Sequence, residues 1–219
     1  MIENKELFDF SKTIAAPLFD GKKYAWEVLG DIKEFILKLG PTLPADEYDN
    51  PAEGVWIAKD ATVFDSAYLG APCIIDHGAE IRQCAFIRTT AIVGMNAVVG
   101  NSTELKNVVL FDNVQVPHYN YVGDSVLGYK SHMGAGSITS NVKSDQTLVV
   151  VKNGDEHIET GRKKFGAILG DHVEVGCNSV LNPGTVVGSN TNIYPLSSVR
   201  GVVPADSIYK SADNIVNKR

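Results

Sequence analysis

The chain has 219 residues, 20 Lys and Arg against 26 Asp and Glu, and a formal net charge of −6, with 44% hydrophobic residues. The negative charge argues against nucleic acid as a partner, because phosphate backbones are bound by clustered Lys and Arg. No apolar run approaches the roughly 20 residues that span a bilayer, and the acidic start, MIENKELFDF, lacks a signal-peptide core. These features predict a cytoplasmic protein without membrane contact. The three cysteines form no CxxC pair, so we expect neither a disulfide framework nor a metal site.

The N-terminal part of the chain contains one predicted helix. Residues 25–39, AWEVLGDIKEFILKL, have apolar side chains at helical spacing, and Gly40-Pro41 is a stop signal. We expect this helix to cap the open first end of the β-structure that follows, where bare strand edges invite aggregation. A role in contacts between subunits is the alternative. Residues 42–54 are rich in proline and acid, so residues 1–54 are predicted to form a helical segment and linker.

A six-residue repeat dominates the next part of the sequence. An aliphatic residue recurs at every sixth position from Ile57 to Leu105, and again from Leu169 to Val199. A period of six fits neither an α-helix, which needs 3.6 residues, nor hairpins, which alternate between turns. It indicates short strands separated by tight corners, with three repeats to each coil. The repeat therefore predicts an all-β solenoid, a parallel β-helix over residues 55–201, in which stacked coils pair about 4.8 Å apart.

Two segments depart from the repeat. Residues 142–165 contain TLVVVK-NG-DEHIET, which predicts a β-hairpin with its turn at Asn153-Gly154. Such an excursion is either functional or merely decorative, and the sequence leaves both open. Residues 202–219 are expected to form a tail that folds over the last coil.

The chemistry is expected where the repeat is violated, after Leu105, because function tends to appear where local rules fail. Arg88 and Lys106 are separated by three repeats, one full coil, and are predicted to occupy the same position on successive coils. One coil before Arg88 stands Gly70, and one coil after Lys106 stands Asp124, which lies past the interruption, so no fixed carboxylate partner is expected. Two stacked cations predict an anion site, with phosphate the natural ligand. The alternative is that both side chains splay into solvent.

The sequence resembles a known family at two levels. The repeats, among them I-V-G-M-N-A and I-L-G-D-H-V, are similar to those of the hexapeptide-repeat acyltransferases. The stretch K-N-V-V-L-F-D-N-V-Q-V-P-H-Y-N-Y-V-G-D, followed by G-A-G-S-I-T-S-N, resembles the acetyltransferase half of the bifunctional N-acetylglucosamine-1-phosphate uridyltransferases. This resemblance implies a left-handed β-helix and a homotrimer. It also implies acetyl-CoA as co-substrate, with an amino-sugar phosphate or a sugar nucleotide as acceptor.

The resemblance also implies residue roles. Arg88 and Lys106 would hold the sugar 1-phosphate, Tyr121 and Asn141 would bind the sugar, and His118 would be the general base. An N–H group of the G-A-G turn at 134–136 would stabilise the oxyanion. The residues expected to line the coenzyme A channel are Ala135, Cys177 and Pro195.

Some features depart from the family pattern. His132 stands where the family has an asparagine that contacts the sugar, and Cys177 replaces a serine. The acceptor, and whether it is an amine or a hydroxyl, therefore stays open. The Gly-rich loop of the nucleotidyl-transfer half is not found, so we expect no nucleotidyl transfer. The alternatives are a noncatalytic sugar-nucleotide-binding β-helix and a subunit that works with a separate nucleotidyltransferase chain. A metal enzyme of the γ-carbonic anhydrase type is disfavoured, because the five histidines include no closely spaced pair.

Overall fold

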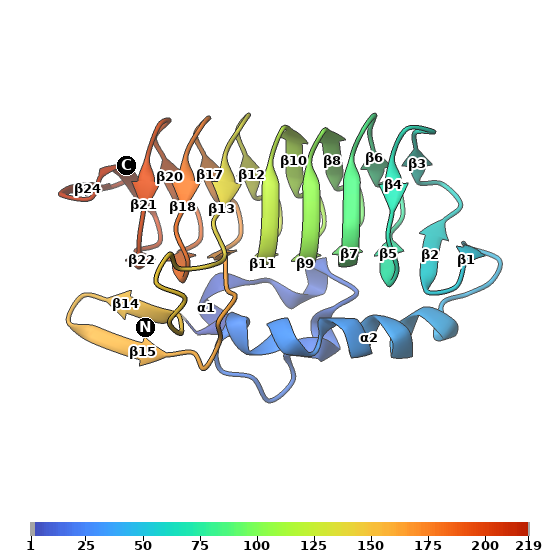
Figure 1. Ribbon diagram of the computed structural model, residues 1–219, viewed down its shortest axis with the longest axis horizontal. Coiled ribbons are helices and arrows are strands. Elements are labelled where there is room, and N and C mark those ends of the chain that lie inside the picture. The colour runs from blue at the N-terminus through green and yellow to red at the C-terminus, as the bar shows by residue number, and fades with distance from the viewer. Residues whose placement is uncertain (1–2, 219) are drawn as a thin grey trace.

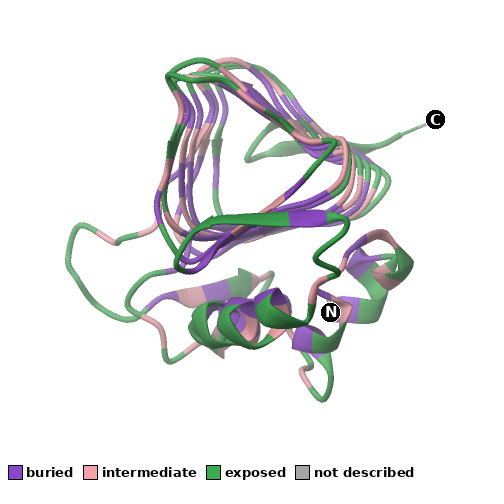
Figure 2. Ribbon diagram, turned by 90° about the vertical axis from the view of Figure 1, so that its right-hand side faces the viewer, coloured by how far each residue is buried: buried purple, intermediate pink, exposed green. Residues whose placement is uncertain are grey.

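The computed structural model describes residues 3–218, and most of them wind into a parallel β-helix, as the repeat predicts (Figure 1). Seen along its axis, the solenoid is a triangular prism with three flanks (Figure 2). The hand of the coils, which the six-residue spacing does not set, stays a prediction from the family resemblance.

Two flanks belong to one 13-stranded sheet, because three long strands bend around the corner between them. These strands are β7 (Phe86–Val93), β9 (Glu104–Leu110) and β11 (Tyr121–Leu127). Their first halves form the open flank with β4 (Tyr68–Leu69), β13 (Ile138–Thr139), β18 (Val180–Leu181) and β21 (Ser198–Val199). Their second halves form the covered flank with β2 (Val55–Ala58), β5 (Cys73–Ile75), β16 (Ala167–Leu169), β19 (Thr185–Val187) and β22 (Val202–Val203).

The third flank is a separate nine-stranded sheet. Its strands are β3 (Thr62–Val63), β6 (Glu80–Ile81), β8 (Val98–Asn101), β10 (Gln115–His118), β12 (His132–Met133), β17 (Glu174–Val175), β20 (Asn192–Ile193), β23 (Ser207–Ser211) and β24 (Asn214–Asn217).

The core of the prism consists of aliphatic side chains stacked in register. On the covered flank the buried inner row runs through Ile75, Val93, Leu110, Leu127, Leu169, Val187 and Val203. The phase of the repeat changes after Leu105, as expected, but inward aliphatic residues are not lost there. The aliphatic rule continues, but the steps from Leu105 to Leu110 and from Val122 to Leu127 take five residues instead of six. Two coils are therefore one residue shorter than the regular coil, with Leu105 paired to Val122, and the lost residue falls at the corner between the open and covered flanks. In the last coil the step from Val199 to Val203 takes four residues.

The N-terminal segment lies along the side of the prism. The predicted helix over 25–39 divides at Asp31 into a 3-10 helix, η3 (Ala25–Gly30), and α2 (Ile32–Leu39). The expectation that it caps the first end is wrong, because α2 packs on β7 and β9 and η3 packs on β11 (Figures 1 and 2). The other helices of the segment are α1 (Asn4–Leu7), η1 (Phe10–Lys12), η2 (Ala16–Phe19) and η4 (Gly40–Thr42).

The reason for this position is the outer surface of the covered flank, which is apolar as well. Side chains alternate between the two faces of a strand, so the residues between the inner ones point outward. That outward row is fully buried under the N-terminal segment and consists of Ile74, Ile92, Val109, Val126, Ile168 and Val186. Leaving it in water would expose a continuous apolar stripe.

Antiparallel strands complete both ends of the solenoid. β1 (Tyr48–Ala52), which forms within the predicted linker, pairs with β2 at the first edge. The predicted tail first continues the solenoid as β22 and β23, and only β24 folds back. The expected hairpin is present as β14 (Val150–Asn153) and β15 (Glu156–Glu159), although its turn residues are Gly154 and Asp155. Among residues 3–218 no helix is long and apolar enough to cross a membrane.

Candidate functional site

The predicted phosphate-binding residues lie at the corner between the open and covered flanks, which we call the site corner (residues 88–90, 106–107, 123–124 and 140–141). Ile87 pairs with Leu105 in register, but Thr89 pairs with Lys106. Arg88 is therefore an extra residue that bulges from β7. The expected stacking of Arg88 directly on Lys106 is off by one position.

The expectation that these two cations have no carboxylate partner is wrong. Lys106 Nζ lies 2.8 and 2.9 Å from the two carboxylate oxygens of Asp124. Arg88 Nη1 lies 3.2 Å from Glu104 Oε1. The five-residue step explains the first pair: Lys106 pairs with Gly123 in register, so the next residue, Asp124, stands beside it.

Asp124 is the centre of a buried hydrogen-bond network. It is 4% exposed, and besides the Lys106 ammonium it accepts hydrogen bonds from Asn107 Nδ2 at 3.0 Å and from Asn141 Nδ2 at 2.6 Å. Asn107 also donates to the carbonyl of Leu29 at 2.9 Å, which ties the N-terminal segment to the site corner. Several donors on one carboxylate fix the position of each donor, because each loses its partner if it moves.

Tyr121 extends this network onto the open flank. Asn141 Nδ2 lies 3.2 Å from the Tyr121 hydroxyl. Burial, and then the nearby carboxylates of Glu104 and Asp124, raise the pKa of Tyr121 above its usual value. Its hydroxyl therefore stays protonated at neutral pH and can donate a hydrogen bond to a ligand on the open flank.

His118 lies at the other edge of the open flank, at the corner shared with the third flank, which we call the His118 corner. It ends β10 and is exposed, and its imidazole makes no hydrogen bond to any of residues 3–218. Its backbone is held by Asn120, which is 2% exposed: Oδ1 accepts from His118 N at 3.1 Å, and Nδ2 donates to Gly134 O at 2.9 Å. The backbones of His118 and Tyr121 lie within about 10 Å of each other, because three residues span at most that distance. Both backbones therefore border the open flank.

The three expected coenzyme A-lining residues stack at the His118 corner. Main-chain hydrogen bonds run from Gly136 N to His118 O, from Asn178 N to Ala135 O and from Leu196 N to Cys177 O, at 2.9–3.0 Å. Ala135, Cys177 and Pro195 thus follow His118 on successive coils. Gly134 N and Gly136 N donate to main-chain carbonyls, whereas Ala135 N makes no hydrogen bond within the part of the chain that the structure describes. The Ala135 N–H group is therefore free to donate a hydrogen bond to a ligand.

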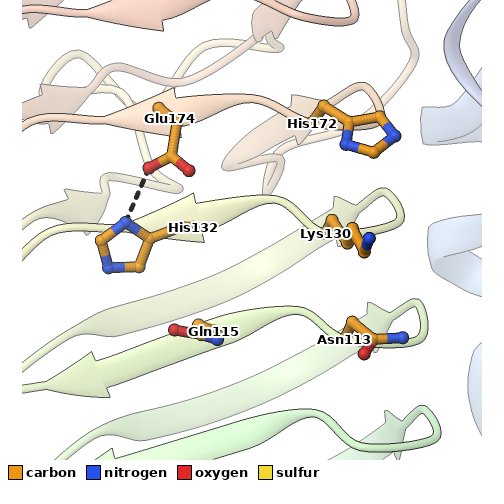
Figure 3. A pocket seen from close by; sticks show the side chains of 6 residues that line it. All are labelled: Asn113, Gln115, Lys130, His132, His172 and Glu174. Atoms are coloured by element: carbon orange, nitrogen blue, oxygen red, sulfur yellow. Dashed lines mark hydrogen bonds and ion pairs between the residues drawn. The ribbon is translucent and has the colours of Figure 1, made fainter.

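His132 is not brought together with the other predicted sugar-binding residues. It lies on β12 of the third flank, where its Nδ1 is 2.8 Å from Glu174 Oε2 (Figure 3). The cavity there, about 360 Å³, is also lined by Asn113, Gln115, Lys130 and His172. A contact between His132 and a ligand at Tyr121 and Asn141 would therefore require a second copy of the chain.

Reasoning from the sequence missed three residues of the network, namely Glu104, Asn107 and Asp124. The signal that would have found Asp124 is the pair of five-residue steps. Once Leu110 and Leu127 are taken as inner residues, Lys106 and Asp124 fall on the same corner of adjacent coils.

Comparison with known proteins places this chain in a family. The sequence model of the family described as the GMPPB C-terminal domain matches residues 69–193, more than half of the chain. The chain belongs to that family. The resemblance to the bifunctional sugar-phosphate enzymes is confirmed as well. The bifunctional protein GlmU of Methanococcus maripaludis is 35% identical over 136 residues, covering 62% of this chain and 33% of that protein.

A second relative is the bifunctional sugar-1-phosphate nucleotidylyltransferase/acetyltransferase of Sulfurisphaera tokodaii. It is 33% identical over 156 residues, covering 71% of this chain and 39% of that protein. The chain thus spans 33% to 39% of the length of these relatives. Among solved structures, a hexapeptide transferase family protein from Anaplasma phagocytophilum is 14% identical, with a TM-score of 0.42 and coverage of 75% of this chain and 80% of that one. That TM-score is too low to bear on function.

Proposed function

We propose that this protein is an acetyl-CoA-dependent acyltransferase that acetylates an amino-sugar phosphate or a sugar nucleotide. The observation that supports it best is the network at the site corner. Lys106, Tyr121 and Asn141 are held in place by contacts to Asp124 or to one another, and Arg88 lies beside them. The exposed His118 borders the same flank. The name of the Sulfurisphaera tokodaii relative, which pairs a sugar 1-phosphate with acetyl transfer, agrees with this arrangement.

In the proposed reaction the acceptor sugar lies on the open flank, with its phosphate toward Arg88 and Lys106. Acetyl-CoA lies along Ala135, Cys177 and Pro195. His118 removes a proton as the acceptor amine attacks the thioester carbonyl. The C–N bond forms, the C–S bond breaks, and coenzyme A leaves as its thiol. Ala135 N–H donates to the oxyanion that develops on the carbonyl oxygen.

Lys106 and Arg88 already have carboxylate partners, so a bound phosphate would contact cations that are already paired with Asp124 and Glu104. Arg88 is the more available of the two, because its side chain is 55% exposed and Glu104 forms only a single contact with it at 3.2 Å. Lys106 is 19% exposed and is held by both oxygens of Asp124. We therefore propose that the Arg88 side chain moves to contact the phosphate. Lys106 supplies a positive charge at a fixed position beneath the phosphate.

We also propose that the enzyme is a homotrimer and works in the cytoplasm. The N-terminal segment occupies the covered flank, which leaves the open and third flanks for contacts between copies. These two meet at the His118 corner, where Tyr119 and Leu196 are 64% and 79% exposed. Large apolar side chains so exposed at one edge favour burial against another chain. A second copy there would also supply His132 to the site.

The direct test is a thiol-release assay with acetyl-CoA and glucosamine 1-phosphate, alongside light scattering to measure the mass in solution. The proposal predicts thiol release that depends on the acceptor and a mass three times that of the chain. The absence of thiol release with every amino-sugar phosphate and amino-sugar nucleotide tried would favour the noncatalytic alternative. A monomeric mass at micromolar concentration would contradict the trimer.

A further inference from the structure

A second group of cations lies further along the site corner, where the β14–β15 hairpin meets the last coils. We call it the basic pocket. It has a volume of about 170 Å³ and is lined by Lys143, Val150, Lys152, Pro183, Arg200 and Gly201. None of the roles assigned above uses these residues.

The pocket is fixed by close packing between the hairpin and the solenoid. Gly184 and Gly201 have φ angles of +82° and +70°, and a Cβ at Gly201 would lie 2.6 Å from the Lys152 carbonyl oxygen. A Cβ at Gly184 would lie 2.7 Å from Val149 Cγ1. Glycine at both corners therefore lets the hairpin approach, and Val149 and Val151 are buried in the contact.

Two of the three cations in the pocket are uncompensated by the residues that the structure describes. Lys143 has partners, since its Nζ lies 3.5 Å from Asp145 Oδ2 and donates a hydrogen bond to Thr147 Oγ1. Within residues 3–218 the other two cations have none, because the side chains of Lys152 and Arg200 form no ion pair and no hydrogen bond. Lys152 and Arg200 are exposed and line one pocket without carboxylate partners, which favours an anion there. An Arg fork with a lysine suits phosphate oxygens. The pocket is smaller than sites for drug-sized ligands, which begin at roughly 300 Å³, and this size favours a phosphate or diphosphate group.

We propose that the basic pocket binds a phosphate or diphosphate group of a small-molecule ligand. Its position suggests which ligand, in a step that rests on the proposed function. Ser140 N bonds to Leu181 O, and Asn182 N bonds to Val199 O, so the corner at Arg200 is two coils beyond Asn141. Two coils are about 10 Å. A sugar nucleotide bound at Asn141 in the opposite orientation, with its diphosphate toward the last coils and not toward Arg88 and Lys106, can therefore extend the diphosphate into the pocket. The pocket thus favours a sugar nucleotide as acceptor.

Calorimetry of the full chain with inorganic pyrophosphate tests the pocket without relying on acyl transfer. Binding to wild type is expected, with the part that depends on the basic pocket identified by its variants. Arg200→Gln and Lys152→Gln should each weaken binding about tenfold, since a hydrogen bond to a charged group is worth about 1.5 kcal/mol. Lys33→Gln, which removes an exposed lysine of α2, is the matched charge control and should bind as wild type. Circular dichroism confirms folding, and Lys152 on the exposed hairpin gives a second variant if Arg200→Gln fails to fold.

Three outcomes would overturn the proposal: no binding to wild type at millimolar pyrophosphate, equal weakening by Lys33→Gln, or weakening by Arg88→Gln alone, which would place the anion at the site corner. The choice of acceptor is tested by thiol release. If the pocket holds the diphosphate, Arg200→Gln should raise KM about tenfold for an amino-sugar nucleotide and leave KM for glucosamine 1-phosphate unchanged. Pyrophosphate binding without any thiol release would retain the pocket and reject the acyltransferase.

Discussion

Replacing Asp124 by Asn is the sharpest test of how the site corner is held together. Asn is nearly the same size, but it removes the negative charge that faces Lys106 and turns one acceptor oxygen into a donor. That donor would face the amide groups of Asn107 and Asn141, which now donate to the carboxylate at 3.0 and 2.6 Å. The substitution therefore removes charge and hydrogen bonding together without opening a cavity.

The expected loss of stability follows from burial. Removing one partner of a buried ion pair typically costs about 3–5 kcal/mol. Asp124 is 4% exposed, but the Lys106 side chain retains 19% exposure and can turn partly toward water. We therefore expect Asp124→Asn to lower the free energy of unfolding by about 2–3 kcal/mol. For a chain of this size that is a fall in Tm of about 4–12 °C.

Urea and thermal unfolding followed by circular dichroism would measure this loss, with wild type and variants at one chain concentration because association alters apparent stability. Glu104→Gln is the matched control at the same corner. Its partner Arg88 is 55% exposed, so the loss should stay below about 1 kcal/mol. The Asp124 network does not hold the corner if the free energy of unfolding of Asp124→Asn lies within about 0.5 kcal/mol of the wild-type value. The same conclusion follows if Asp124→Asn loses no more unfolding free energy than Glu104→Gln.

Three further predictions concern other parts of the molecule. His118→Ala should stay folded and lose about 10²- to 10⁴-fold in kcat, because its exposed side chain fills no core position; steady-state kinetics with unchanged kcat would remove it from the mechanism. Arg88→Ala should weaken binding of a phosphorylated amino sugar more than of its unphosphorylated form; equal losses in calorimetry would rule out a phosphate contact. Phe111→Ala should lower the free energy of unfolding in urea by about 3–5 kcal/mol, because Phe111 is fully buried with its ring centroid 4.9 Å from that of Phe8. A loss below about 1 kcal/mol would show that this contact between the N-terminal segment and the prism is weak.

The sequence alone determined the solenoid, because the inward position of each aliphatic residue depends only on strand alternation and on a corner repeated at fixed spacing. It also determined the order of His118, Tyr121 and Asn141 along the chain, and the hairpin within residues 142–165. These features depend on local geometry, which a period of six residues reports directly.

Only the tertiary structure decided which side chains meet. A coil shortened by one residue moves Asp124 beside Lys106 and shifts Arg88 out of line, although the inner aliphatic residues stay in register. The place of the N-terminal segment was likewise decided by the outward apolar row of the covered flank, whose members are brought together only when the coils stack. Contacts between coils depend on register, and a single lost residue changes that register without altering the hydrophobic pattern within each strand.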